Sequence, residues 1–266
     1  LDLLKQSRDE LFLQNHSLLE ENIFKENTIG GLQIQVQDLQ EQLGVEIEKF
    51  DNLQDEVKDS LETVEIFKKL SETDPQLLQK YSKVYFLNEH YSPKELVQID
   101  PESTIGSKEL HIKKQIGPFL DDLLQAAKRD DIDLKVLSAH RSFGTQASIK
   151  QGYVQTYGTT AANTFSADQG YSEHQLGTTV DFTNSTISSS LSKFKSTKEY
   201  AWLLENAHLY GFALSYPEGN AYYQFEPWHW RFVGKELAKD LYKDDKHFYD
   251  LNQRTLNTYL IGIFDQ

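Results

Sequence analysis

The sequence predicts a chain of mixed α and β structure, in which a long α-helical coiled coil precedes a domain of alternating helices and short strands. Residues 1–70 contain no proline and repeat apolar residues in heptads. The following residues read as helix, strand, helix, loop, strand, helix, hairpin and helix. Charge also changes near residue 70: residues 1–70 carry 7 Lys or Arg and 16 Asp or Glu, and the remaining residues carry 20 and 25.

The predicted coiled coil rests on two rows of heptad positions. The first row holds Leu4, Leu11, Leu18, Leu32 and Leu39, with Lys25 interrupting it. The second row holds Arg8, Asn15, Asn22, Ile29, Val36, Leu43, Phe50, Val57 and Val64. Polar Asn15 and Asn22 weaken such a seam, but they fix its register and the number of strands.

Gly30 and Gly31 allow two arrangements of this segment. A turn there would make residues 1–28 and 32–70 an antiparallel hairpin, and each glycine costs a helix interior about 1 kcal/mol relative to alanine. The heptad phase nevertheless continues unbroken across both glycines, which favours one continuous helix. We interpret the segment as a spacer or dimerisation element; the alternative is a regulatory arm.

The second domain is predicted over residues 75–266, because the turn-forming residues 71–75, which end in Pro75, interrupt the heptads. Its expected helices cover residues 111–129, 145–157, 196–210, 234–243 and 251–264. Its expected strands cover residues 134–137 and 178–182, and residues 212–216 and 222–225 are expected to form a hairpin.

Two motifs carry the residues that point to chemistry: SEHQLGTTVD at residues 172–181 and FEPWHWR at residues 225–231. They contain His174, Asp181 and His229, two imidazoles and a carboxylate of the kind that a catalytic zinc takes while a fourth position stays open to water. Glu226 is the additional carboxylate that accepts a proton from such a water. His174 and Asp181 are too far apart for adjacent helical turns, which favours a histidine on a loop and an aspartate on the next strand.

The pattern S-x-H-x-x-G-x-x-x-D followed by E-x-W-H-x-R resembles the VanY-type D-alanyl-D-alanine carboxypeptidases, zinc peptidases of the LAS superfamily. The resemblance runs from about residue 74 to the C-terminus. It implies an α+β, Hedgehog/DD-peptidase-like fold, in which a small antiparallel sheet carries the zinc and helices surround it. By resemblance, His174, Asp181 and His229 are the zinc ligands and Glu226 is the catalytic base. Thr179 departs from the small alanine usual in this family.

A third motif, SAHRSFGTQ at residues 138–146, resembles the family pattern S-x-Y-R-S followed by a glutamine. By resemblance, Arg141 faces the active site and meets a carbonyl or carboxylate of the substrate, with Gln146 at the family spacing. His140 stands where tyrosine is common; as a fourth protein ligand it would close the site to water. Further substrate contacts are expected at Ser166, Tyr171 and Ser172. Asp168 is expected to be a contact or a turn former.

The resemblance implies an enzyme that removes the C-terminal D-alanine from peptidoglycan stem peptides. One alternative is an L,D-carboxypeptidase or a peptidoglycan endopeptidase of the same fold. Another is a non-catalytic coiled-coil protein that binds the cell wall, which a missing ligand would favour. None of His174, Asp181, His229 and Glu226 is missing.

Composition limits the setting of this activity. The net charge of −14 argues against a nucleic-acid partner, and the chain contains no cysteine for disulfide or thiol chemistry. No methionine is present and the chain opens at Leu1, so a processed ectodomain is expected. We expect an extracytoplasmic location, in the cell envelope or periplasm, with membrane anchoring through a segment absent from this chain. The coiled coil is expected to self-associate or to bind a membrane-protein partner.

Overall fold

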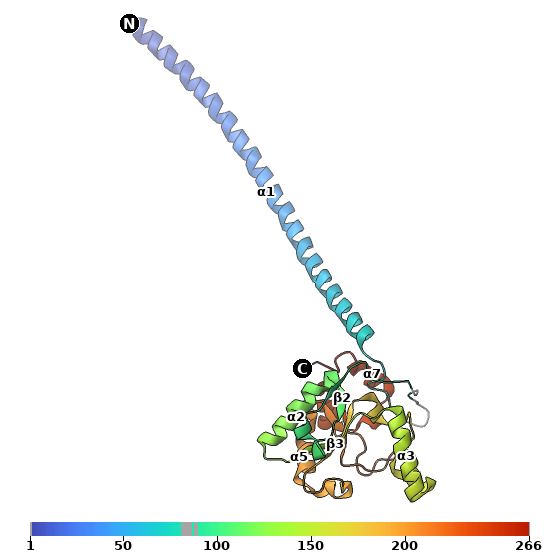
Figure 1. Cartoon of the computed structure of the whole chain (residues 1–266). Helices are drawn as coiled ribbons and strands as arrows, with labels where there is room; N and C mark the ends of the chain where they lie inside the picture. Colours follow the sequence, from blue (N-terminus) through green and yellow to red (C-terminus); the bar gives the residue numbers. More distant parts are fainter. Residues whose placement is uncertain (1, 81–86, 88–89, 266) are drawn as a thin grey trace. The chain divides into compact units, whose positions relative to one another are not determined.

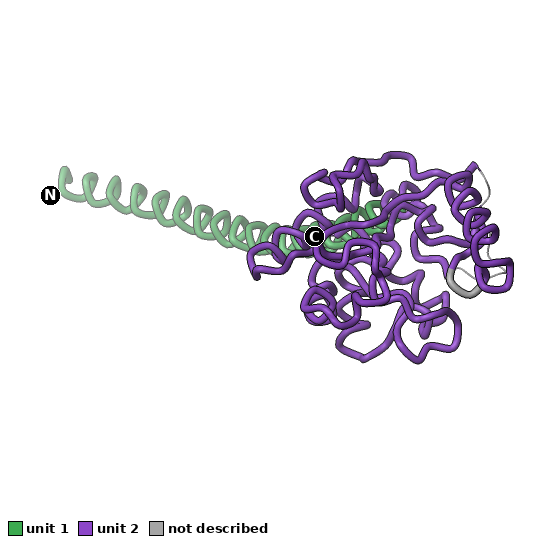
Figure 2. Tube along the Cα trace, turned by 60° about the horizontal axis from the view of Figure 1, so that its bottom comes forward, with its two compact units in different colours: residues 1–67 green, residues 68–266 purple. Residues whose placement is uncertain are grey.

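The computed structural model describes residues 2–80, 87 and 90–265. The chain forms two compact units, Leu1–Phe67 and Lys68–Gln266, which Figure 2 shows in different colours. We call the first unit the arm and the second the C-terminal unit. In the part of the chain that the structure describes, no helix combines the length and apolar character needed to cross a membrane.

Helix α1 (Asp2–Glu72) is a single α-helix that continues through Gly30 and Gly31 (Figure 1). The continuous helix is therefore confirmed over the hairpin. A Cβ atom added to either glycine would meet nothing within 4 Å, so these positions show no packing need for glycine. None of the described residues of α1 is buried, and its heptad leucines are exposed, as Leu18 is at 56%.

The C-terminal unit surrounds a small antiparallel sheet with helices, as the family resemblance predicts. Its helices are α2 (Gly117–Arg129), α3 (Phe143–Tyr157), α4 (Thr159–Phe165), α5 (Lys198–Asn206), α6 (Lys235–Lys243) and α7 (Gln253–Tyr259). Its strands are β1 (Leu96–Gln98), β2 (His111–Lys113), β3 (Lys135–Ser138), β4 (Thr179–Thr183), β5 (Phe212–Leu214) and β6 (His229–Phe232). The strands β3, β4, β6 and β5 form the main sheet in that order, and β1 pairs with β2.

The two faces of the main sheet have different chemistry because side chains alternate along a strand. The register pairs Asp181 with His229 and Val180 with Trp230 across β4 and β6. Apolar residues on one face, including Phe232, join the core and meet α2, where the ring centroids of Phe119 and Phe232 lie 4.8 Å apart. The opposite face carries Asp181 and His229. The core therefore holds the strands in place, and the strands position the polar residues on the opposite face.

The predicted helix over residues 111–129 is wrong in its first six residues. Strand β2 and the 3-10 turn Lys114–Ile116 come first, and α2 begins at Gly117. Pro118 explains the late start, because proline lacks a backbone N–H and fits only the first turn of a helix.

The predicted hairpin between residues 212–216 and 222–225 is also wrong. Strand β5 pairs with β6 instead, with Phe212 opposite Phe232 and Leu214 opposite Trp230. Residues 222–225 form no strand, because the side-chain oxygen of Asn220 accepts the backbone N–H groups of the two residues after Ala221. This local turn takes the donors that a hairpin would have used.

Candidate active site

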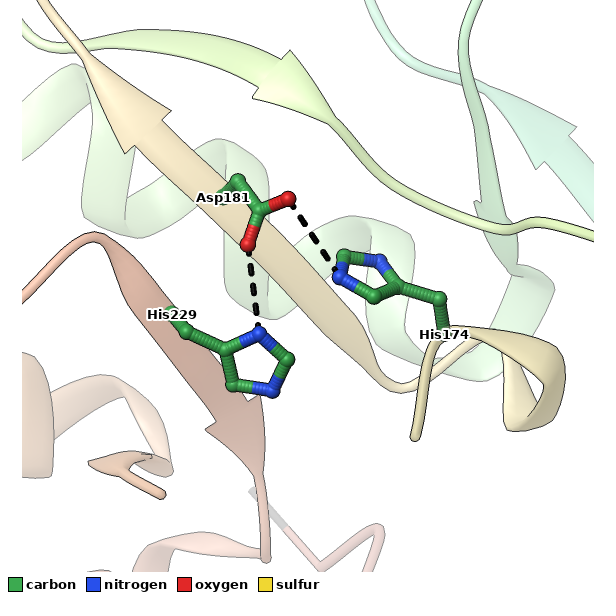
Figure 3. A group of neighbouring side chains, drawn as sticks. All are labelled: His174, Asp181 and His229. Atoms are coloured by element: carbon green, nitrogen blue, oxygen red, sulfur yellow. Dashed lines mark ion pairs between the residues drawn. The ribbon is translucent and has the colours of Figure 1, made fainter. Parts of the chain in front are cut away.

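His174, Asp181 and His229 come together on the polar face of the sheet (Figure 3). All three are buried, and one ligand atom from each lies within 4.8 Å of the other two. The Nε2 atom of His174 is 3.3 Å from Oδ2 of Asp181. The Nδ1 atom of His229 is 3.2 Å from Oδ1 of the same carboxylate. The three side chains thus converge on one shared point.

Local structure explains this convergence. Asp181 and His229 are directly opposite across β4 and β6, so their side chains leave the sheet on the same face. His174 lies in the 3-10 turn Glu173–Leu176, and Gly177 ends the turn at φ +70°. A Cβ atom at Gly177 would lie 3.1 Å from the Pro93 ring, so both conformation and space favour glycine there. The histidine is on a turn and the aspartate on the next strand, as their spacing predicts.

In each histidine, the ring nitrogen that does not face the shared point donates a hydrogen bond elsewhere. Nδ1 of His174 donates to the carbonyl oxygen of Ala139 at 2.7 Å, and Nε2 of His229 donates to Oε2 of Glu173 at 2.9 Å. His174 Nε2 and Asp181 Oδ1 are buried without a hydrogen-bond partner. Buried polar atoms are normally paired, so these unpaired atoms fit a bound cation. Two imidazole nitrogens and one carboxylate oxygen form a donor set that suits zinc.

Glu226 lies beside these three residues, with Oε2 located 3.5 Å from Nδ1 of His229. Burial raises the pKa of Glu226 to about 7, and the Asp181 carboxylate adds to this increase against the opposing effect of His229. A carboxyl group with such a pKa exchanges protons readily near neutral pH.

The two histidines differ in their electrostatics. Burial lowers the pKa of His174 to about 4, and the Arg141 guanidinium adds to the decrease. Burial would also lower the pKa of His229, but the neighbouring carboxylates of Asp181 and Glu173 outweigh it and raise the pKa to about 10. Burial acts to raise the pKa of Asp181, yet the two histidines hold it well below its ordinary range. Asp181 is therefore an ionised carboxylate between the two histidine rings.

Arg141 reaches the same site from the loop after β3. Its Nη2 atom lies 3.6 Å from Oδ2 of Asp181, and its Nη1 atom donates to Oε1 of Gln146 at 3.1 Å. The amide nitrogen of Gln146 donates in turn to the carbonyl oxygen of Ala167 at 2.8 Å. The structure thus joins Arg141 and Gln146, the two residues of the third motif, and ties them to the segment before Ser172.

The other expected substrate contacts lie on that segment. Ser166 and Tyr171 are half-buried, whereas Ser172 is buried at the start of the His174 turn. Lys150 of α3 donates to the carbonyl of Ser166 and pairs with Asp168 at 3.3 Å. The carbonyl of Asp168 accepts the backbone N–H of Tyr171, so Asp168 also forms a turn.

Glu173 and three side chains that donate to it had no role predicted from the sequence. Glu173 accepts hydrogen bonds from His229, Ser215, Arg231 and Tyr249 and is completely buried. Burial acts to raise the pKa of Glu173, but Arg231 and His229 hold it far below its usual range. Glu173 precedes His174, and Arg231 follows His229 by two residues, so strand alternation could have revealed that Arg231 shares the face of His229. Ser215 and Tyr249 carry no such signal.

The family model "VanY: D-alanyl-D-alanine carboxypeptidase" matches residues 109–235. The chain is also 32% identical over 193 residues to YodJ of Bacillus subtilis (strain 168), a protein assigned to the carboxypeptidases, covering 70% of this chain and 68% of that protein. The chain belongs to the VanY family.

Two solved carboxypeptidase structures share this fold. The LD-carboxypeptidase LdcB is 31% identical, with a TM-score of 0.60 over 66% of this chain and 85% of that chain. The D,D-pentapeptidase VanY from a VanB-type resistance cassette, solved in complex with Zn(II), is 30% identical, with a TM-score of 0.55 over 65% of this chain and 97% of that chain. The small antiparallel sheet with surrounding helices is therefore the VanY-type fold, and the predicted fold class is confirmed.

Proposed function

We propose that this VanY-family chain is a zinc-dependent carboxypeptidase that removes the C-terminal D-alanine from peptidoglycan stem peptides. The observation that carries the proposal is the buried cluster of His174, Asp181 and His229 with Glu226 beside it. The family description and the zinc complex of a relative support the same activity.

In this proposal, His174, Asp181 and His229 hold the zinc ion. When bound, zinc supplies Lewis acidity toward water and the scissile carbonyl. Glu226 accepts a proton from the attacking water at its carboxylate and then delivers that proton to the leaving amine. Burial of Glu226 suits both steps, because a pKa of about 7 allows the group to gain and lose a proton at neutral pH.

Arg141 is proposed to bind the substrate. Its planar guanidinium can pair with both oxygens of a carboxylate, and it stays charged at all working pH values. The hydrogen bond from Arg141 to Gln146 orients this group toward the side of the site where Asp181 lies. Ser166, Tyr171 and Ser172 are proposed to line the adjoining wall, with Ser172 acting through its place in the His174 turn.

A second candidate is an L,D-carboxypeptidase, which acts on the tetrapeptide stem. The observation that favours it is the likeness to LdcB, since the identity of 31% matches the 30% to the D,D-pentapeptidase. A peptidoglycan endopeptidase of the same fold is a further alternative. The three differ in the peptide they shorten and in their need for a free terminal carboxylate.

For the rest of the chain, we propose that residues 75–266 are the catalytic domain and that residues 1–70 self-associate as a coiled coil or dock on a membrane-protein partner. The exposed heptad residues of α1 support an intermolecular contact, because apolar rows at this spacing are covered by another helix in coiled coils. Action on peptidoglycan places the enzyme outside the cytoplasm, in the cell envelope or periplasm.

The proposal is tested by incubating the purified chain with synthetic stem pentapeptide and tetrapeptide, with and without a chelator, and reading the products by mass spectrometry. We expect the pentapeptide to lose one D-alanine in a chelator-sensitive reaction. Shortening of the tetrapeptide alone would favour the L,D-specific enzyme. A C-terminal amide cleaved as fast as the free acid would favour the endopeptidase, and Arg141→Ala should then have little effect.

Glu226→Gln is the matched catalytic control for this experiment. It should keep zinc and the fold but lower turnover by roughly 10²–10⁴-fold, the contribution of a general base. Near-normal turnover of Glu226→Gln would show that another group takes the proton. No cleavage of either peptide by the zinc-loaded wild type would overturn the proposed function.

A further inference from the structure

We infer that Glu173 is a positioning residue that fixes the metal-facing orientation of His229. Arg231, Tyr249 and Ser215 hold the Glu173 carboxylate in place for this task. This inference rests on the proposed zinc function, because it concerns how a ligand of that metal is aimed.

The two nitrogens of the His229 ring face different partners. Nδ1 faces the shared point, 3.2 Å from Asp181, while Nε2 donates to Oε2 of Glu173 at 2.9 Å. A half-turn of the ring about the Cβ–Cγ bond would exchange each nitrogen for a carbon. The flipped ring would present a C–H group to Glu173 and another to Asp181. The hydrogen bond to Glu173 therefore selects the orientation that leaves Nδ1 available to a metal.

Four hydrogen-bond donors hold the Glu173 carboxylate in one orientation. Oε2 also accepts the hydroxyl of Ser215 at 2.7 Å. Oε1 accepts Nη1 of Arg231 at 2.9 Å and the hydroxyl of Tyr249 at 2.7 Å. Each carboxylate oxygen thus has two donors, and the Glu173 side chain is 0% exposed. With its acceptor sites taken, Glu173 orients His229 and does not compete with it for the metal.

Arg231 is itself held by residues farther from the site. Nη2 of Arg231 donates to the carbonyl oxygens of Leu77 at 2.7 Å and Gln79 at 3.1 Å. The guanidinium carbon also lies 4.3 Å from the centre of the Phe248 ring. The fully buried Arg231 is therefore fixed on several sides. Its second set of partners is the segment that begins the predicted catalytic domain.

The contrast with His174 makes the role testable. The main-chain carbonyl of Ala139 anchors His174, and no side-chain substitution removes it. The orientation of His229 depends instead on the side chain of Glu173, which a substitution can change. Glu173→Gln keeps the size and shape of the side chain, but its amide nitrogen donates instead of accepting. That nitrogen must face either the donors of His229 and Ser215 or the donors of Arg231 and Tyr249.

The experiment measures zinc affinity of the full chain by competition with a chromophoric chelator, together with the visible spectrum of the Co²⁺-loaded protein. We expect Glu173→Gln to bind zinc about 10–100-fold more weakly and to change the cobalt spectrum. Glu199→Gln is the matched control. Glu199 is likewise buried, at 2% exposure, but it accepts from Asn184 and not from a histidine. This variant should keep wild-type zinc affinity and spectrum.

Wild-type affinity and an unchanged cobalt spectrum in folded Glu173→Gln would overturn the inference while the proposed function stands. If the wild type binds no zinc, the proposed function fails and this inference fails with it. If Glu173→Gln does not fold, Tyr249→Phe decides the question, because it removes one donor from the carboxylate without changing charge. Weaker zinc binding by Tyr249→Phe supports the positioning role, and unchanged binding overturns it.

Discussion

Apolar residues of the same types are exposed in the arm and buried in the C-terminal unit. Phe50 in the arm is 66% exposed, whereas Phe182 in the C-terminal unit is 0% exposed. The arm repeats its apolar residues along one helix that has no packing partner in its own unit, so their burial requires another molecule. The C-terminal unit closes its core within one chain and buries even Arg231 and Glu173 as an ion pair at 2.9 Å. The difference supports the proposal that the arm associates with another helix, whereas the C-terminal unit is stabilised by its own core.

The largest expected difference concerns metal. The wild type should bind about one zinc ion per chain. His174→Ala and His229→Ala should each lose this zinc, and hydrolysis with it, because the two remaining protein ligands do not hold the ion. His16→Ala is the matched control in the arm, where the His16 side chain is 63% exposed. Elemental analysis of the purified variants is the measurement. Full zinc occupancy in both site variants would contradict the assigned ligands.

The next difference concerns core packing. Phe182→Ala should lower the free energy of unfolding of the C-terminal unit by about 3–5 kcal/mol, because it leaves a cavity beneath the sheet. Phe50→Ala should leave that free energy unchanged. Denaturant unfolding followed by tryptophan fluorescence separates the two units, since Trp202, Trp228 and Trp230 all lie in the C-terminal unit. An equal loss in both variants would show that the units unfold together.

Removal of the arm tests the independence of the C-terminal unit directly. We expect the full chain to self-associate, and a truncation that begins near Asp74 to be monomeric and as active as the full chain. This start keeps Leu77 and Gln79, whose carbonyl oxygens bind Arg231. Sedimentation and the peptide assay are the measurements. An insoluble or inactive truncation would show that the arm is part of the catalytic fold.

The smallest effects are expected at glycines. Gly30→Ala and Gly31→Ala should each stabilise the arm helix by about 1 kcal/mol, since both positions are helical and open. Gly211→Ala should instead destabilise the C-terminal unit, because Gly211 has φ +83° and a Cβ atom there would lie 2.7 Å from the Phe232 ring. Thermal unfolding followed by circular dichroism shows whether each variant is more or less stable than the wild type. A stabilised Gly211→Ala would contradict the packing described at that turn.

Much of the fold was predictable where structure is set by neighbours in the sequence. The heptad rows predicted a helix that continues through Gly30 and Gly31, and the structure confirms it. The predicted hairpin failed at Tyr222, because alternation showed strand-forming residues but not that Asn220 would take their backbone donors. Pairing of β5 with β6 depends on register between distant segments, which residue patterns do not contain.

The sequence by itself determined the resemblance to VanY-type carboxypeptidases and named His174, Asp181, His229 and Glu226, because those residue types stand at the spacing of short, specific motifs. Only the tertiary structure decided which nitrogen of each histidine faces the shared point and which groups hold it there. Glu173 meets Arg231 and Tyr249 across 58 and 76 residues of chain. Such contacts depend on the packing of a sheet, a turn and a distant loop, so no local sequence pattern predicts them.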